Sequence, residues 1–344
     1  MITEKQFACI REELMHSRRP LFIFDDDPDG LASFLLLYRL VREGKGFPLK
    51  SDPILKERYA AKVEEYGADK VFVLDIPMIE QGFADAVKVP IIWIDHHGPH
   101  PVSGVQYFNP RLANKDDNLP TSWNCYQVAR QDLWIAMAGI VGDWYLDYAA
   151  EFHQQYPRLL PADVQRPQDA LFASELGTLV KVFSFILKGK TGEVMKAIKV
   201  LTRIQDPLEI LDGTTPQGRF ILKKYQEINK EYSLLIKQAL KEGKKKGKLL
   251  QFIYQADSNS FTKELSNELL YHFPEKTILV CREKEGKMKC SLRESELALP
   301  AIVQKALAGL EGYGGGHEHA CGTVVAAADF PKFVERVKEG VGDR

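Results

Sequence analysis

The chain has 344 residues, of which 45% are hydrophobic and 27% charged, and its formal net charge is −1. This length accommodates two ordinary domains with buried cores. The near-neutral charge excludes a protein that binds nucleic acid through a global excess of positive charge, so such binding would need a local patch. The longest apolar run near the N-terminus, residues 31–37, is far too short to span a bilayer. The N-terminal segment also lacks the layout of a secretion signal, so we expect a cytoplasmic protein with no membrane partner.

Short apolar runs alternate with amphipathic segments in the first hundred residues. Residues 21–24, 71–74 and 89–94 are predicted strands, and apolar residues at helical spacing predict helices over residues 31–42 and 55–66. Strands that alternate with helices are typical of βαβ units. The predicted fold class is therefore α/β, with an N-terminal, mostly parallel sheet flanked by helices.

The pattern becomes helical after this region and then returns to strands. Residues 133–141 and 220–240 are predicted helices, and residues 249–254, 277–281 and 288–292 are predicted strands of a smaller C-terminal α/β domain. Between them, residues 242–248 hold four lysines and two glycines. We favour a solvated hinge for this run, with a phosphate-binding patch as the alternative. The predicted domains are 1–190, a helical linker over 191–247, and 248–344.

The chain contains five cysteines and no CxxC pair. This usage suits a reducing cytosol, and it predicts neither a disulfide framework nor a thiolate zinc site.

Each predicted strand of the N-terminal half ends in an acid, namely Asp25, Asp75 or Asp95. Ligands of parallel sheets bind beyond the carboxyl ends of the strands. The stretch from Asp25 to Asp29 holds four carboxylates in five residues. An exposed acidic turn before a helix is the simpler interpretation, because acids are favourable at a helix N-terminus. The alternation of Asp25, Asp27 and Asp29 instead favours convergence on a cation, with Gly30 allowing a tight turn.

Further candidate ligands follow along the chain. Asp75 and Asp143 lie in apolar surroundings, where a charge must be paired or bound to a metal. Asp143 by itself is as consistent with a structural role as with ligation. His96 and His97 follow directly after Asp95. Carboxylates and imidazoles without thiolates suit Mn²⁺ or Mg²⁺, and imidazole favours Mn²⁺. Two metal ions would need about this many carboxylates, one of them bridging.

Together these motifs resemble the DHH phosphoesterase superfamily, specifically its RecJ-like and nanoRNase-like branch. Asp25 to Gly30 resembles the first motif, Asp75 the second, Asp95-His96-His97 the third and Asp143 the fourth. The stretches from Ser291 to Ser295 and from Gly314 to His317 resemble the two signatures of the DHH-associated C-terminal domain. Two departures, Asp25 in place of histidine and Leu31 in place of a further aspartate, argue against an inorganic pyrophosphatase. Since the sequence ends after these signatures, we expect no extra OB-fold domain of the kind found in bacterial RecJ.

The resemblance implies specific roles for these residues. It implies two Mn²⁺, with Mg²⁺ as an alternative, and Asp75 as the bridging ligand. It implies that Asp95 orients His96, and that His97 faces the substrate phosphate as a catalytic residue. The implied metal ligands are Asp25, Asp27, Asp29, Asp75, His96 and Asp143, and the implied substrate-binding residues are Ser291, Arg293, Gly315, Gly316 and His317.

The expected activity is release of nucleoside monophosphates from single-stranded DNA or RNA, or from short oligonucleotides, by two-metal hydrolysis. A phosphoesterase that acts on a cyclic dinucleotide or on 3′-phosphoadenosine 5′-phosphate is the second hypothesis. A non-catalytic replication scaffold ranks last, because every expected ligand is present. Replication or repair proteins are expected as possible partners.

Overall fold

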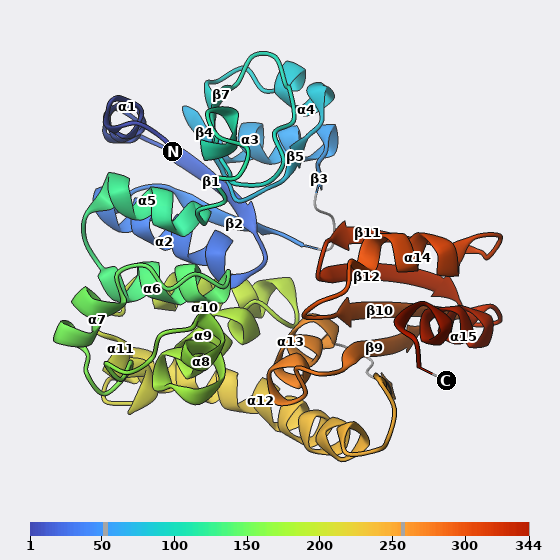
Figure 1. Ribbon diagram of the computed structural model, residues 1–344. Coiled ribbons are helices and arrows are strands. Elements are labelled where there is room, and N and C mark those ends of the chain that lie inside the picture. The colour runs from blue at the N-terminus through green and yellow to red at the C-terminus, as the bar shows by residue number, and fades with distance from the viewer. Residues whose placement is uncertain (51–53, 256–258, 344) are drawn as a thin grey trace. The chain divides into compact units, whose positions relative to one another are not determined.

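The computed structural model describes residues 1–50, 54–255 and 259–343. The chain divides within a long helix, α12 (Pro216–Gly243), into two units, Met1–Tyr225 and Gln226–Arg344 (Figure 1). The α/β fold class predicted from the sequence is confirmed in both units. The sequence predicted three segments with boundaries at residues 190 and 247, a finer division than the two units. These boundaries stay predictions.

The N-terminal unit is built on a parallel sheet with the strand order β2-β1-β4-β6-β7 (Figure 1). The predicted strands at its centre are confirmed. Two edge strands were not predicted, because one contains Pro48 and the other has only three residues. The strands are β1 (Pro20–Asp25), β2 (Lys45–Leu49), β4 (Lys70–Leu74), β6 (Ile91–Ile94) and β7 (Gln106–Phe108), and β3 (Ile54–Leu55) pairs separately with β5 (Met78–Ile79).

Helices cover both faces of this sheet. One face packs against α2 (Pro28–Val41), on which α5 (Thr121–Ala129) and α6 (Leu133–Gly142) pack in turn. The other face packs against α3 (Ala60–Tyr66) and α4 (Gln81–Ala86) (Figure 1). The helix predicted over residues 55–66 begins only at Ala60, because Leu55 lies in β3 and a 3₁₀ turn, Glu57–Tyr59, comes between. The other helices of this unit are α1 (Glu4–Met15), α7 (Ala149–Gln155), α8 (Pro167–Ala173), α9 (Glu175–Ile186), α10 (Thr191–Leu201) and α11 (Pro207–Leu211), with a 3₁₀ turn at Pro110–Leu112.

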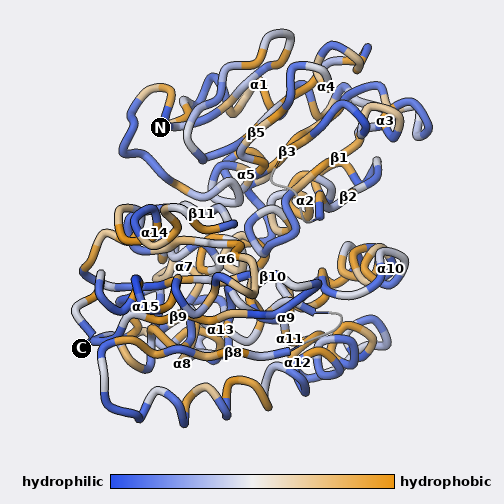
Figure 2. The backbone as a smooth tube through the Cα atoms, turned by 90° about the vertical axis from the view of Figure 1, so that its right-hand side faces the viewer, coloured by the Kyte–Doolittle hydropathy of each residue, from blue (hydrophilic) through white to orange (hydrophobic). Residues whose placement is uncertain are grey.

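Strand β1 is buried on both faces. Leu21 and Ile23 belong to the core under α3 and α4. Phe22 and Phe24 point to the opposite face, where the ring of Phe24 stacks on that of Phe34 with centroids 4.9 Å apart. This double burial explains the continuous apolar run in the sequence, which Figure 2 shows as hydrophobic colour along β1.

The N-terminus of α9 depends on a glycine. The side chain of Ser174 accepts a hydrogen bond from the Gly177 amide, and a Cβ at Gly177 would lie 1.9 Å from the Leu171 carbonyl oxygen. We expect Gly177→Ala to lower the free energy of unfolding by about 3 kcal/mol, because the backbone would have to shift. Gly192→Ala in α10, where no atom lies within 4 Å of the new Cβ, is the matched control and should change stability by less than about 1 kcal/mol. Chemical denaturation measures both, and equal effects of the two substitutions would contradict the steric argument.

The connection from α1 to β1 is tied to the sheet by Asp69. Burial raises the pKa of Asp69, but the hydrogen bonds that it accepts from the Ser17 hydroxyl and the Arg18 and Arg19 amides outweigh burial, so its pKa lies below the ordinary value of 3.8. A carboxylate with a lowered folded-state pKa stabilises the protein above its unfolded-state pKa and loses this effect as the pH falls.

We therefore expect Asp69→Asn to lower the free energy of unfolding by about 1 kcal/mol at pH 7. The difference from the unmodified protein should shrink as the pH falls below about 4. Urea titrations at several pH values measure this difference, and a difference that grows towards acid would contradict the assignment.

The C-terminal unit contains a second sheet with the order β11-β12-β10-β9-β8. Its pairs are antiparallel except for β8 and β9, and its core forms against α14 and α15. Neither β11 nor β12 was predicted, and for β11 the reason is that the run from Gly312 to Gly316 lacks the side chains typical of a strand. The elements are β8 (Leu249–Gln255), α13 (Thr262–His272), β9 (Thr277–Lys284), β10 (Lys287–Arg293), α14 (Leu299–Leu307), β11 (Gly312–His317), β12 (Ala320–Ala326) and α15 (Phe330–Val341).

Strands β9 and β10 form a tight hairpin. Glu285 and Gly286 both have positive φ, 55° and 72°, as a type I′ turn requires. This turn places Cys281 directly opposite Cys290, and the two form a disulfide. The sequence predicted no disulfide framework, and it did not indicate this single bond. Two cysteines nine residues apart form no recognisable sequence motif. The hairpin register, which the sequence alone does not give, is needed to show that they lie opposite each other.

Across the residues that the structure describes, no helix combines the length and the apolar character needed to cross a membrane.

Candidate metal centre

Three acids gather at the carboxyl edge of the parallel sheet. Asp25 is the last residue of β1, and Asp75 and Asp95 directly follow β4 and β6. These strands are neighbours in the sheet, so the topology brings together residues far apart in the sequence. Asp75 adopts a left-handed backbone conformation with φ of 61° while its amide donates to the Ile94 carbonyl. Such a conformation is uncommon for a residue other than glycine and is often found at functional sites.

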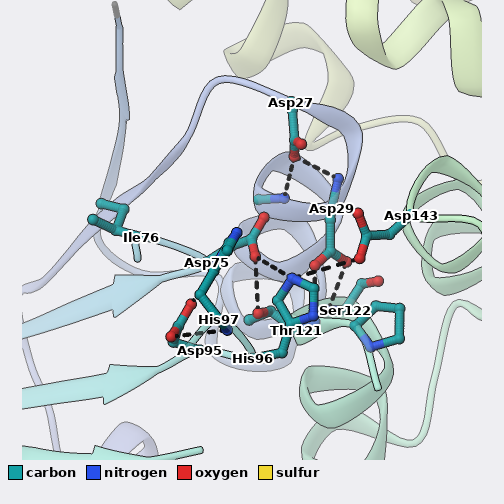
Figure 3. A network of polar contacts seen from close by, with 12 residues as sticks. Asp27, Asp29, Asp75, Ile76, Asp95, His96, His97, Thr121, Ser122 and Asp143 are labelled. Atoms are coloured by element: carbon teal, nitrogen blue, oxygen red, sulfur yellow. Dashed lines mark hydrogen bonds and ion pairs between the residues drawn. The ribbon is translucent and has the colours of Figure 1, made fainter. Parts of the chain in front are cut away.

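The turn between β1 and α2 adds two more carboxylates. Asp27 is the N-cap of α2, and its side chain accepts hydrogen bonds from the amides of Asp29 and Gly30, at 3.0 and 3.1 Å (Figure 3). A Cβ at Gly30 would lie 2.5 Å from the Asp25 carbonyl oxygen, so only glycine lets α2 start this close to the end of β1. The acidic turn thus serves as a helix cap and as part of a carboxylate cluster at the same time.

Helix α5 contacts the cluster through its first residues. The amides of Thr121 and Ser122 donate to the two carboxylate oxygens of Asp29, at 2.8 and 2.9 Å, and the Thr121 hydroxyl donates to Asp75 at 3.1 Å (Figure 3). These contacts fix the direction of two buried carboxylates. Neither residue was predicted from the sequence, although Thr121 and Ser122 after Pro120 are a recognisable helix start.

His96 faces two of the acids. Its Nε2 lies 3.4 Å from an oxygen of Asp75 and 3.5 Å from an oxygen of Asp143, which caps the C-terminus of α6 (Figure 3). The other ring nitrogen, Nδ1, donates to the Asn118 carbonyl at 3.4 Å. This second contact leaves Nε2 as the nitrogen that faces the carboxylates, as in many metal-binding histidines.

The ligating atoms form overlapping groups. Within each group the atoms lie less than 4.8 Å from one another, which is the spacing needed to share one cation. Asp75 belongs to two of the groups, and His96 also belongs to two. The groups are Asp25, Asp27 and Asp75; Asp75, His96 and His97; and Asp29, His96 and Asp143.

The charges of this cluster are unfavourable without a cation. Burial and the nearby Asp143 carboxylate raise the pKa of Asp29 to about 6. Burial, with Asp29 and the other acids, raises the pKa of Asp75 well above its ordinary value. For His96, burial lowers the pKa, but Asp143 and Asp29 outweigh it and the net pKa is raised. The donor set of oxygens and imidazole, crowded with like charge, therefore fits divalent cations such as Mn²⁺ or Mg²⁺.

Asp95 is fully buried and contacts a different histidine from the one expected. Its carboxylate accepts a hydrogen bond from His97 Nδ1 at 2.7 Å and another from the His97 amide. The expectation that Asp95 orients His96 is therefore wrong, because the chain turns after β6 and folds the His97 ring back over Asp95. Tyr107 and Asn109, which were not predicted, donate to the other oxygen of Asp95 at 3.1 and 3.0 Å.

Comparison with known proteins concerns the fold and the C-terminal domain. Residues 249–343 match the DHHA1 domain family. The fold resembles that of RecJ from Thermus thermophilus in complex with Mn²⁺, with a TM-score of 0.69 and 15% identity over 98% of this chain and 54% of that one. The chain has a RecJ-like fold, and its C-terminal residues 249–343 match the DHHA1 domain. It spans about half the length of Thermus RecJ.

Two further solved structures have a similar fold. One is an exonuclease RecJ bound to manganese, with a TM-score of 0.58 and 16% identity over 99% of this chain and 95% of that one. The other is PggH from Vibrio cholerae, a pGpG-specific phosphodiesterase, with a TM-score of 0.50 and 14% identity over 94% of this chain and 99% of that one. No curated protein sequence matches the chain. The RecJ-like assignment made from the sequence is thus confirmed at the level of the fold and of the DHHA1 domain.

The DHHA1 domain carries the predicted substrate-binding residues. Arg293 and His317 both pair with Ala320, so they lie in one row across β10, β12 and β11. The Arg293 guanidinium donates to the Asn267 side chain at 2.6 Å and to the Ser291 hydroxyl at 3.0 Å, and burial lowers its pKa to about 10. Ser291 is buried and therefore contacts Arg293 rather than solvent. Strand β11, which carries Gly315, Gly316 and His317, is exposed along its whole length.

Proposed function

We propose that the chain is a metal-dependent phosphodiesterase that releases nucleoside monophosphates from single-stranded or short oligonucleotides. The observation that carries this proposal is the convergence of seven carboxylate and imidazole side chains, His97 among them, at one edge of a RecJ-like sheet. Asp25, Asp27, Asp29, Asp75, His96 and Asp143 would hold two Mn²⁺, with Mg²⁺ as the alternative. When bound, these ions supply a Lewis acid for the phosphoryl oxygens and lower the pKa of water.

The reaction is a hydrolysis with no covalent enzyme intermediate. Water adds to phosphorus, the bond from phosphorus to the leaving sugar oxygen breaks, and that oxygen takes up a proton. His97 is placed to stabilise the charge that develops on the phosphoryl group. In its imidazolium form, the ring donates from Nδ1 to Asp95 and can donate from Nε2 to a phosphate oxygen. The imidazole is about a third exposed, so a substrate can reach it.

The DHHA1 domain would bind a neighbouring phosphate of the substrate. Arg293 provides a guanidinium for phosphate oxygens, and Ser291 acts through Arg293 by holding one of its nitrogens. The exposed glycines of β11 allow an anion to approach the backbone closely, and His317 lies at the end of the same strand. A phosphate held here favours action at a strand end, so we propose exonuclease rather than endonuclease activity.

The test uses short RNA and DNA oligomers labelled at the 5′ or the 3′ end, incubated with the protein and Mn²⁺ or Mg²⁺. Progressive appearance of labelled mononucleotide with one label position supports an exonuclease and reports its direction. Four intact oligomers in the presence of a protein that binds Mn²⁺ would overturn the nuclease proposal.

A small nucleotide is the second candidate substrate, and the fold shared with PggH favours it. Linear and cyclic dinucleotides and 3′-phosphoadenosine 5′-phosphate should then be compared with a short oligomer at equal concentration in one reaction. Preferential consumption of the oligomer supports the first proposal, and preferential consumption of a small nucleotide supports the second.

Metal binding has a readout that is independent of activity. We expect Mn²⁺ at about a hundred times its dissociation constant to raise the free energy of unfolding by about 2.7 kcal/mol, because the cation relieves repulsion among buried carboxylates. This corresponds to a rise in melting temperature of about 5–10 °C. Asp143→Asn should reduce the rise, whereas the exposed Asp116→Asn should leave it unchanged. Thermal denaturation with and without Mn²⁺ measures the effect, and an unchanged melting temperature would argue against the site.

A further inference from the structure

The outer strand β8 of the DHHA1 sheet has a free edge. Among the described residues it pairs with β9 alone, and Figure 2 shows it as the lowest strand of this sheet. In a parallel pair, alternate backbone amides and carbonyls of an edge strand point away from its partner. Natural edge strands usually carry a lysine, a proline or a bulge that prevents pairing with another chain. The sequence of β8, Leu-Leu-Gln-Phe-Ile-Tyr-Gln, contains no charged residue and no proline.

A groove of about 770 Å³ runs along this edge. One wall is β8 itself, another is the end of α12 and the lysine run that follows it, and a third is the C-terminal end of α15. Ile253 is 45% exposed, so the groove also offers an apolar contact. The groove is lined entirely by residues of the C-terminal unit.

The groove carries an excess of positive charge. Its lining includes Lys241, Lys245, Lys246 and Lys338, against two acids, Glu242 and Asp343. Both acids are already engaged: Glu242 pairs with Lys245 at 2.5 Å, and the two oxygens of Asp343 accept from the backbone amides at the start of β8. No ion pair within the described part of the chain neutralises the other three lysines.

We propose that this groove binds an acidic, extended peptide segment of a partner protein, which adds to the sheet beside β8. The free backbone groups of β8 provide the hydrogen bonds of an added strand, and the lysines Lys241, Lys246 and Lys338 select acidic side chains. A nucleic acid strand fits the same charge less well, because it cannot pair with a strand edge and because the aromatic residue of the lining, Phe252, is only 6% exposed and offers no stacking surface. The sequence left two interpretations of the lysine run at residues 242–248, a hinge or a phosphate-binding patch. The proposal gives this run the role of binding acidic side chains.

The test measures binding of a short fluorescein-labelled peptide that alternates glutamate and valine to the full-length protein by fluorescence anisotropy. We expect the triple variant Lys241→Gln, Lys246→Gln, Lys338→Gln to weaken binding at least tenfold. A matched triple variant on exposed lysines outside the groove, Lys230→Gln, Lys237→Gln, Lys332→Gln, should change it less than twofold. Circular dichroism shows that each variant is folded.

A second probe separates strand addition from charge attraction. The same peptide with every second backbone nitrogen methylated keeps all its charges but cannot pair as a strand, so we expect it to bind at least tenfold more weakly. Equal binding of the two peptides, or equal effects of the two triple variants, would overturn the proposal. The proposal is also wrong if the peptide does not bind while the groove variant alone loses affinity for oligodeoxythymidylate, because the groove would then be a nucleic acid site.

Discussion

Asp75→Asn should lower the rate of oligonucleotide hydrolysis at saturating Mn²⁺ by at least about 10³-fold, or about 4 kcal/mol in activation free energy. Asp75 is shared by two of the three ligand groups, and its carboxylate also accepts from Thr121 and faces His96. Asparagine keeps the shape of the side chain and its carbonyl oxygen. It removes the negative charge that two neighbouring cations would share, so the loss should exceed that of any other single ligand.

The control is Asp116→Asn, which removes an exposed carboxylate outside the ligand groups and should leave the rate within twofold. Calorimetric titration with Mn²⁺ then shows whether the Asp75 variant has lost one cation or both. If Asp75→Asn kept more than a tenth of the rate, the assignment of Asp75 as the shared ligand would be wrong, even with the phosphodiesterase activity intact.

The position of the site could be predicted because it follows from the topology of the sheet. Asp25, Asp75 and Asp95 each end an apolar run, and a parallel sheet brings the carboxyl ends of its strands to one edge. Only the alternation of strands and helices had to be recognised. The structure agrees, since β1, β4 and β6 are neighbours and share a register.

The contacts that orient these acids could not be predicted, because they depend on segments far away in the sequence. Thr121 and Ser122 approach Asp29 across more than ninety residues of chain. Tyr107 and Asn109 reach Asp95 from β7 and the turn that follows it. No local sequence pattern indicates these contacts, because they depend on the packing of α5 on α2 and of β7 on β6.

The partner of Asp95 illustrates a finer limit. His96 and His97 are adjacent in the sequence, and a choice between them depends on how the chain turns after β6. The structure directs His96 towards Asp75 and Asp143, and His97 back towards Asp95.

The glycine-rich strand β11 could not be predicted from the sequence either. Glycine weakens the strand pattern, and only pairing with β12 makes the segment a strand.

Asp95→Asn should lower kcat by about 10²-fold and leave KM within about twofold. The carboxylate holds His97 Nδ1 as a donor, which leaves Nε2 to face the substrate. Asparagine has no negative charge to stabilise a positively charged His97 ring, so the ring would stabilise the charge on the phosphoryl group less well. The variant loses a charge at a fully buried position, so its folding must first be verified by circular dichroism and by its melting temperature.

Two further variants distinguish a positioning role from a structural one. Tyr107→Phe removes one donor to Asp95 but keeps the carboxylate, and it should lower kcat less than about fivefold. If Asp95 acts through His97, the double variant Asp95→Asn, His97→Gln should be no slower than His97→Gln alone, because the two residues function as one unit. If the two losses multiply, Asp95 supports the site independently of His97, for example through the turn held by Asn109. The hydrogen bond between Asp95 and His97 would then not explain the effect of Asp95→Asn.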